Sequence, residues 1–202
     1  MIFHGLVTVR RIMANPGRLF REYLGGMRSS YYKPIAFFIL NTAVYILIRA
    51  LVDYDPLEGR FENMENGDAP DSVKYSELAA RFMVNNINYI LFTLVFAIAL
   101  CFKVFYRRRY YLAEYTAIDF YIAGLYILFS IITMLLNVYS DIQFSSGQLV
   151  LLFVLIFYCA VRFIRPVTFG SVSKSLLIGI FSVLLYMLFS FGLSLILVLI
   201  IS

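Results

Sequence analysis

Five long apolar stretches constrain this chain more than any other feature of its sequence. They cover residues 35–52, 84–105, 115–137, 149–164 and 175–201. A helix needs about 20 mostly apolar residues to cross the roughly 30 Å hydrocarbon core of a bilayer. None of these stretches alternates apolar and polar residues as a membrane β-barrel strand does. The sequence therefore predicts an all-α integral membrane bundle of five transmembrane helices.

The composition agrees with lipid as the surrounding medium. Hydrophobic residues make up 62% of the 202 residues and charged residues only 14%, whereas soluble domains have about 25% charged residues. The net charge of +5 comes from residues at the ends of the apolar stretches, so we expect membrane lipids as partners and no nucleic acid. Cys101, Cys159 and His4 are too few to supply the roughly four ligands of a structural zinc site, so we expect free thiols and no metal or cofactor.

The distribution of basic residues predicts the orientation of the chain. Those expected on the side of the N-terminus are Arg10, Arg11, Arg18, Arg21, Arg28, Lys33, Lys103, Arg107, Arg108, Arg109, Arg162, Arg165 and Lys174. The opposite side carries only three, which are Arg60, Lys74 and Arg81. By the positive-inside rule, the chain is predicted to be a multi-pass cell-membrane protein with a cytoplasmic N-terminus and an outer C-terminus.

The chain divides into an N-terminal segment, residues 1–34, and a transmembrane bundle, residues 35–202. The bundle includes an acidic outer loop, residues 53–81, that holds eight of the twelve acidic residues. Calcium prefers several oxygen ligands, so Asp53, Asp55 and Glu58 are one candidate cation site. A solvated acidic loop without a bound ion is the other interpretation.

Residues 1–34 are predicted to form short amphipathic interfacial helices. One apolar stripe contains Ile2, Leu6, Val9 and Met13, and a second contains Leu19, Phe20, Tyr23, Leu24 and Met27. Such helices lie in the plane of the lipid headgroups. The residues predicted to contact anionic headgroups are Arg10, Arg11, Arg18, Arg21, Arg28 and Lys33. Packing beneath the bundle is the alternative role for this segment.

Short motifs in the N-terminal segment carry a resemblance to a known family. They are Pro16-Gly17, Arg21-Glu22-Tyr23, Gly25-Gly26-Met27-Arg28 and Tyr31-Tyr32-Lys33-Pro34. Together they resemble an uncharacterised bacterial family of multi-spanning membrane proteins, in which a lysine is usual where Met27 stands here. The resemblance is strongest over residues 8–45, and Glu114, Tyr158 and Arg162 also look like family positions. Many members carry a zinc ribbon ahead of this segment, which is not seen in this sequence. The resemblance implies a helical fold in the bacterial cytoplasmic membrane and no established activity.

Polar residues inside the apolar stretches are the main candidates for a function. They share one side of the first or third predicted helix and are Asn41, Arg49, Asp119, Tyr126, Ser130, Thr133 and Asn137. One interpretation is a polar path or a small-ligand cavity, because ionisable groups within a membrane tend to mark function. The other interpretation is hydrogen bonding between helices. An unpaired carboxylate in the membrane is costly, so Asp119 is predicted to pair with Lys103 or Arg162 on the cytoplasmic side.

The last apolar stretch has a face of small or hydroxyl-bearing residues. They are Ser175, Gly179, Ser182, Tyr186 and Ser190. Small residues allow helix backbones to approach closely, which is what favours helix association in lipid. This face is predicted to pack tightly, either within the bundle or between copies of the chain.

Sequence motifs for catalysis are missing, and we predict no catalytic residue. The sequence contains no Gly-x-Ser-x-Gly, His-Glu-x-x-His or P-loop pattern. We therefore expect a non-enzymatic accessory or scaffold subunit that associates with itself or with another membrane protein. A small transporter or channel that uses the polar face is the alternative. A lipid-modifying enzyme is the third hypothesis, although Glu114 and Asp119 would then lie on different faces of one helix.

Overall fold

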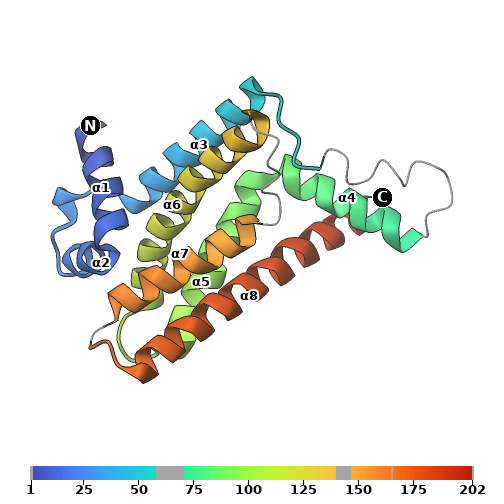
Figure 1. Ribbon diagram of the computed structural model, residues 1–202. Coiled ribbons are helices and arrows are strands. Elements are labelled where there is room, and N and C mark those ends of the chain that lie inside the picture. The colour runs from blue at the N-terminus through green and yellow to red at the C-terminus, as the bar shows by residue number, and fades with distance from the viewer. Residues whose placement is uncertain (1, 58–70, 140–146, 165, 202) are drawn as a thin grey trace.

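The structure, a computed structural model, describes residues 2–57, 71–139, 147–164 and 166–201 (Figure 1). Every regular element within these ranges is helical, so the all-α prediction is confirmed. The elements in chain order are α1 (Ile2–Ala14), α2 (Pro16–Leu24), the short 3-10 helix η1 (Arg28–Ser30), α3 (Pro34–Leu51), α4 (Asp71–Asn85), α5 (Ile87–Phe105), α6 (Leu112–Tyr139), α7 (Gly147–Phe163) and α8 (Phe169–Ile201).

Three helical segments are long and apolar enough to cross a membrane. They are Arg28–Leu51, Leu112–Tyr139 and Phe169–Ile200. The pair α4–α5 also qualifies when it is taken as one bent span, and α7 is a shorter apolar helix. By length and composition, the described chain therefore has three spans, or up to four, where the sequence predicted five.

Four helices pack in a ring. Helix α5 contacts α6 and α8, and α7 contacts the same two helices from the other side. Helix α3 packs on the outside of this ring against α6, while α2 packs against α7. The long helices lie alongside one another in Figure 1, so the interior of the ring is the core of the protein. Its largest fully buried side chains include Phe102, Tyr115 and Tyr121.

The segment before α5 differs from the prediction. The predicted span began at residue 84, but residues 71–85 form α4, and the chain then bends by 91° into α5. The bend falls at Asn85 and Asn86, and the Asn86 side chain donates to the Phe82 carbonyl 3.0 Å away. Asparagine competes with helical backbone bonds in this way. Helix α4 instead packs along α8, at the end of the molecule opposite α1 and α2 (Figure 1).

Helix α8 is longer than predicted because it begins at Phe169 instead of residue 175. Thr168 and Ser171 cap its first turn reciprocally. The Thr168 N–H donates to Ser171 Oγ over 2.9 Å, and the Ser171 N–H donates to Thr168 Oγ1 over 3.3 Å. These bonds satisfy amide groups that have no partner within the helix.

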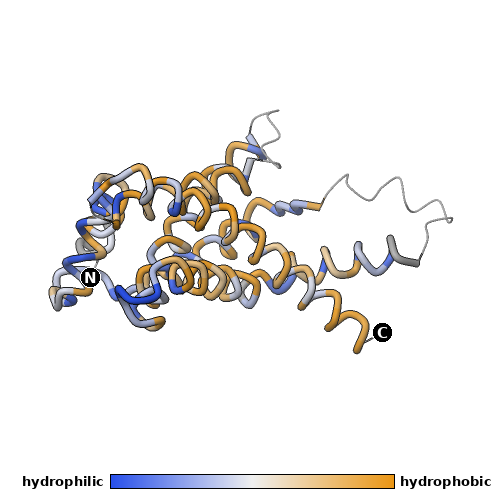
Figure 2. The backbone as a smooth tube through the Cα atoms, turned by 90° about the horizontal axis from the view of Figure 1, so that it is seen from below, coloured by the Kyte–Doolittle hydropathy of each residue, from blue (hydrophilic) through white to orange (hydrophobic). Residues whose placement is uncertain are grey.

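The N-terminal helices form a cap on one end of the bundle. We define the cap as α1, α2 and η1. Figure 2 shows hydrophilic residues gathered at this end and hydrophobic residues along the long helices. Of the predicted α1 stripe, Val9 packs against the core of the bundle, whereas Met13 is 51% exposed. Thr8 and Ile12, which lie outside the predicted stripe, are fully buried.

Candidate functional site

The centre of the helix ring contains one polar or sulfur-bearing side chain from each of its four helices. These are Cys101 on α5, Asp119 on α6, Cys159 on α7 and Ser182 on α8, all buried. Asp119 lies within electrostatic range of both thiols, and Ser182 lies beside Cys101. Neither Asp119 oxygen nor Ser182 Oγ has a hydrogen-bond partner among the described residues. This ring centre is therefore an unsatisfied polar site within an apolar core.

The predicted ion pair of Asp119 is not formed. The Lys103 ammonium donates instead to the carbonyls of Arg107 and Tyr110, each 2.9 Å away. The Arg162 guanidinium lies over the Tyr158 ring, 5.8 Å from its centroid. Lysine and arginine at helix ends direct their charges towards the interface, whereas Asp119 points into the ring. The expectation that Asp119, Lys103 and Arg162 lie on the same side of the membrane was thus not enough to predict a contact between them.

Most of the predicted polar face bonds to backbone carbonyls of the chain. The Asn41 amide donates to the Gly124 carbonyl over 3.3 Å and links α3 to α6. Ser130 Oγ and Thr133 Oγ1 donate to carbonyls of their own helix, at 3.0 Å each. Tyr126 is buried on the same helix. Asn41 therefore makes a hydrogen bond between helices, whereas Ser130 and Thr133 bond within their own helix.

Arg49 and Asn137 make polar contacts at the end of the bundle opposite the cap. Arg49 donates to the carbonyl of Tyr54 over 3.1 Å and to that of Val84 over 2.7 Å. The Asn137 amide donates to the Tyr54 hydroxyl over 3.2 Å. Arg49 thereby ties the end of α3 to the end of α4, and its charge offsets the negative end of the α4 dipole.

The small-residue face of α8 lies inside the bundle. Ser175, Ser182 and Ser190 are fully buried, Gly179 is buried and Tyr186 is half-buried. A Cβ at Gly179 would lie 2.9 Å from the Phe153 ring on α7. Ser190 Oγ lies 2.9 Å from Thr93 Oγ1 on α5. Of the two predicted uses for this face, the structure has packing within one chain.

The cap is joined to α7 by a close backbone approach at Gly17. A Cβ at Gly17 would lie 1.8 Å from the Arg162 carbonyl oxygen, so only glycine fits at this position. The neighbouring Arg21 donates to the carbonyls of Arg162 and Phe163, at 3.0 and 3.1 Å. These carbonyls belong to the last turn of α7 and lack partners within the helix. Arg21, for which contact with lipid headgroups was predicted, caps this helix.

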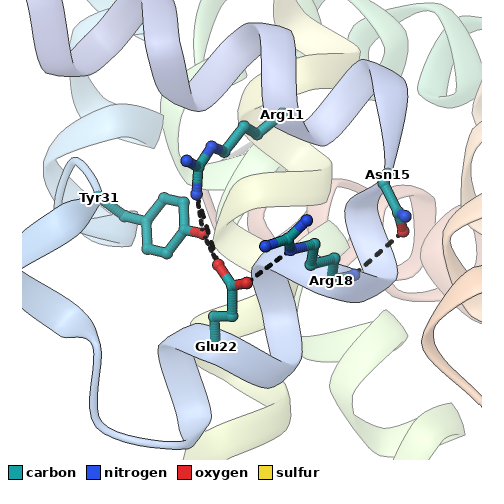
Figure 3. Close-up of polar contacts among 5 residues, drawn as sticks. All are labelled: Arg11, Asn15, Arg18, Glu22 and Tyr31. Carbon is teal, nitrogen blue, oxygen red and sulfur yellow. Dashed lines mark hydrogen bonds and ion pairs between the residues drawn. The ribbon is translucent and has the colours of Figure 1, made fainter.

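Glu22 is the centre of a polar network in the cap (Figure 3). Its Oε1 accepts from Arg18 Nε at 2.6 Å, and its Oε2 lies 3.4 Å from Arg11 NH1. The Tyr31 hydroxyl also donates to Glu22, and it accepts from Arg11 over 2.7 Å. Asn15 Oδ1 accepts the Arg18 N–H and begins α2. The network joins α1, α2 and the segment that leads into α3.

The network sets the charge state of Glu22. The Arg18 guanidinium and the Tyr31 hydroxyl both bond to the Glu22 carboxylate and hold its pKa below the ordinary value. Glu22 in turn raises the pKa of Arg18. Opposite charge and hydrogen bonds to the ionised form cause such shifts. Glu22 is therefore ionised at neutral pH and holds the cap together as an anion.

Tyrosines attach the cap to the bundle from two directions. The Tyr121 hydroxyl of α6 donates to the Tyr32 carbonyl, and the Tyr32 N–H donates to Thr8 Oγ1 over 3.1 Å. On α7, the Tyr158 hydroxyl donates to the Met13 carbonyl over 3.0 Å. The alternative that the N-terminal segment packs beneath the bundle therefore describes the structure.

The remaining predicted headgroup residues stay accessible. Arg10, Arg28 and Lys33 are exposed, and the Arg18 side chain is 70% exposed even within its ion pair. Arg11 is 51% exposed. The exposed surface of the cap is thus basic.

The cavities do not follow the predicted polar path. Three cavities of about 1010, 400 and 360 Å³ are lined mainly by apolar residues, and Asp119, Ser130 and Asn137 line none of these three. Within the described ranges, no three His, Cys, Asp or Glu side chains lie close enough to hold a metal ion. Of the candidate calcium ligands, Asp55 accepts the Leu57 N–H at 2.9 Å, and Glu58 lies outside the described residues.

The pair considered for lipid modification is not brought together. Glu114 accepts the Tyr111 N–H at 2.7 Å in the first turn of α6, while Asp119 faces the ring interior.

Sequence reasoning also missed the contacts of Gly17, Glu22 and Gly124. A glycine inside a helix costs about 1 kcal/mol relative to alanine, so Gly17 and Gly124 were themselves signals of close approach.

Comparison with known proteins finds a match that includes most of the cap. A family model described as a protein of unknown function (DUF3667) matches residues 6–46. The matched segment contains Gly17, Arg21, Glu22 and Tyr31, and it continues through most of α3. Searches of curated proteins and of solved structures found no match. Over residues 6–46, the chain is thus similar to an uncharacterised domain family.

Proposed function

We propose that this chain is a non-enzymatic accessory or scaffold subunit in the bacterial cytoplasmic membrane. In this proposal it crosses the membrane five times, through α3, α5, α6, α7 and α8. Its N-terminus is cytoplasmic and its C-terminus lies outside. It associates with further copies of itself, and another membrane protein is the alternative partner.

The observation that carries the proposal is that side chains of the matched segment, residues 6–46, make their contacts within the chain. Its distinctive side chains, among them Gly17, Arg21 and Glu22, bond or pack within the chain. They build a basic platform against the end of the bundle. A segment whose chemistry is directed at its own architecture suits a protein that positions other proteins.

The five-span count is supported by the packing of the shorter helices. Helices α5 and α7 lie alongside α6 and α8 (Figure 1). With 19 and 17 residues, they extend about 28 and 26 Å. These lengths are close to the thickness of the hydrocarbon core.

The exposed side of α8 supports self-association. Only 11% of the residues in its most apolar stretch are buried, compared with 56% for α6. Ile180, Leu184 and Met187 share one exposed face, with Leu184 56% exposed. We place the contact between copies on this face, because the small-residue face is already occupied by α5 and α7.

Subunit counting in native-lipid particles tests this function. The full chain carries one fluorophore, and photobleaching steps report the number of copies per particle. We expect two or more copies, and fewer for Leu184→Trp. Leu47→Trp is the matched control, because Leu47 is 60% exposed on α3. Single copies without a stoichiometric partner protein would contradict the proposal.

A proton-coupled transporter is the second candidate, and the unpartnered carboxyl of Asp119 favours it. Ionisable groups buried in membrane proteins often belong to proton or ion pathways. Liposomes that contain the purified chain and a pH-sensitive dye test this candidate. Proton flux that is lost in Asp119→Asn and kept in Cys159→Ser would support transport, whereas equal flux in all three proteins and in empty liposomes would exclude it.

A further inference from the structure

Two cavities lie next to each other and share part of their lining. The cavity of about 1010 Å³ lies between α5, α6 and α8, and the cavity of about 400 Å³ lies between the cap, the start of α3 and the start of α6. Thr116 and Phe120 line both. We call the combined space the lateral groove.

The main part of the lateral groove is apolar and open to the side. Phe92, Phe96 and Leu193 line it and are 46%, 50% and 43% exposed. An exposed apolar hollow of this size normally marks a binding site. At the depth of the membrane spans, the surrounding molecules are lipid acyl chains.

The cap end of the lateral groove is positively charged. Tyr23 and Pro34 line this end. The Arg28 guanidinium lies over the Tyr23 ring, 5.9 Å from its centroid. Lys33 directly precedes Pro34 and is exposed. This is also the end where hydrophilic residues gather in Figure 2.

We propose that the lateral groove binds one anionic glycerophospholipid from the leaflet on the cap side. Its phosphate contacts Arg28 and Lys33, and an acyl chain runs past Phe120 towards Phe92. An apolar chain joined to an anionic head matches both ends of the groove. A transmembrane helix from a second copy would fill the apolar part and leave the cationic end without a counter-charge. The inference rests on the membrane insertion proposed above.

Gly192 allows the acyl part to be tested without disturbing the bundle. It lines the larger cavity, and a Cβ there would meet no atom within 4 Å. Gly192→Phe therefore fills the groove from within. Gly170→Phe is the matched control, because Gly170 also lies on α8 with open space around its Cβ and outside the lining of either cavity.

The measurement is native mass spectrometry of the full chain in detergent with added phosphatidylglycerol or phosphatidylcholine. We expect wild type and Gly170→Phe to retain one phosphatidylglycerol in preference to phosphatidylcholine. Gly192→Phe should retain each lipid about tenfold less. Arg28→Gln should lower the preference for phosphatidylglycerol about fivefold, whereas Arg10→Gln, which removes the same charge from an exposed cap position, should not.

A second measurement on unmodified protein keeps the inference testable if Gly192→Phe does not fold. Phosphatidylglycerol with a photoreactive acyl chain should label residues 92–96 and 116–120. Equal retention of both lipids by wild type, or labelling elsewhere, would overturn the inference. Labelling of these residues by a second copy of the chain would also overturn it. A membrane-inserted, self-associated protein without a selective lipid would contradict this inference alone, because subunit counting tests the proposed function independently.

Discussion

Gly17→Ala should detach the cap from α7. The added Cβ would lie 1.8 Å from the Arg162 carbonyl oxygen, and ordinary contact begins at 3.4 Å. The backbones must therefore separate by about 3.4 − 1.8 = 1.6 Å. The hydrogen bonds of Arg21 to Arg162 and Phe163, now 3.0 and 3.1 Å long, would not survive that shift.

The expected energy follows from opposing contributions. Overpacking costs about 1–3 kcal/mol, and hydrogen bonds from a charged group contribute about 1.5–3 kcal/mol each when buried. Water replaces part of the latter, because one of the two Arg21 bonds is exposed. The higher helix propensity of alanine offsets about 1 kcal/mol of this destabilisation. The clash outweighs this gain, and the net destabilisation of the docked cap is about 2 kcal/mol.

Hydrogen exchange detected by mass spectrometry measures this effect directly. A loss of about 2 kcal/mol makes opening of the cap about 30-fold more frequent. Amides of α2 should exchange faster by this factor, while those of α6 should not change. Gly5→Ala is the control, because a Cβ at Gly5 would meet nothing within 4 Å. Equal exchange in the two variants would refute the argument that Gly17 permits the close approach.

Three further predictions concern the network, the bundle and the topology. Because the pKa of Glu22 is lowered in the folded cap, the ionised carboxylate stabilises the cap at neutral pH, and this stability is lost as the pH falls through the lowered pKa, below 4.5. The protection of cap amides, relative to their intrinsic exchange rate at each pH, should fall there in wild type, whereas Glu22→Gln should already show the lower protection at pH 7 and lack this transition. Gly179→Leu should lower the melting temperature in detergent by several degrees, because the Phe153 ring occupies the space its Cβ needs, while Leu47→Ile, at an exposed position of α3, should leave it unchanged. For topology, a C-terminal alkaline phosphatase fusion should be active and a C-terminal cytoplasm-dependent fluorescent fusion dark, and the reverse pair would contradict an outer C-terminus.

The sequence predicted the helices well where one physical rule dominates. Apolar length located α3, α5, α6 and α7 to within about three residues and α8 to within six, because exclusion of charge from lipid outweighs local preferences. The same rule failed at residues 84–87, where two asparagines end one helix before the next begins. Apolar length cannot register this local competition for backbone hydrogen bonds.

Candidate site residues were found more readily than their partners. Asp119 was identified because a carboxylate within an apolar helix is conspicuous. Cys101, Cys159 and Ser182, the other side chains at the ring centre, come from three other helices. Which side of each helix faces the ring centre depends on how the helix is rotated about its axis, and a single sequence does not reveal that rotation. The capping contact of Arg21 was missed for the same reason, because the end of α7 that it caps lies 141 residues further along the chain.

With the five spans proposed above, the pairing of α7 with α8 would make this protein sensitive to the thickness of its membrane. Helix α7 has 17 residues and is about 26 Å long, whereas the adjacent α8 has 33 residues and is about 50 Å long. A bilayer with a 30 Å core is too thick for one and too thin for the other. It must thin around α7, while α8 reduces its hydrophobic mismatch by tilting. A thicker membrane would reduce the tilt of α8 and change its angle to α4. A change in bilayer thickness would therefore alter helix packing at the end of the molecule opposite the cap.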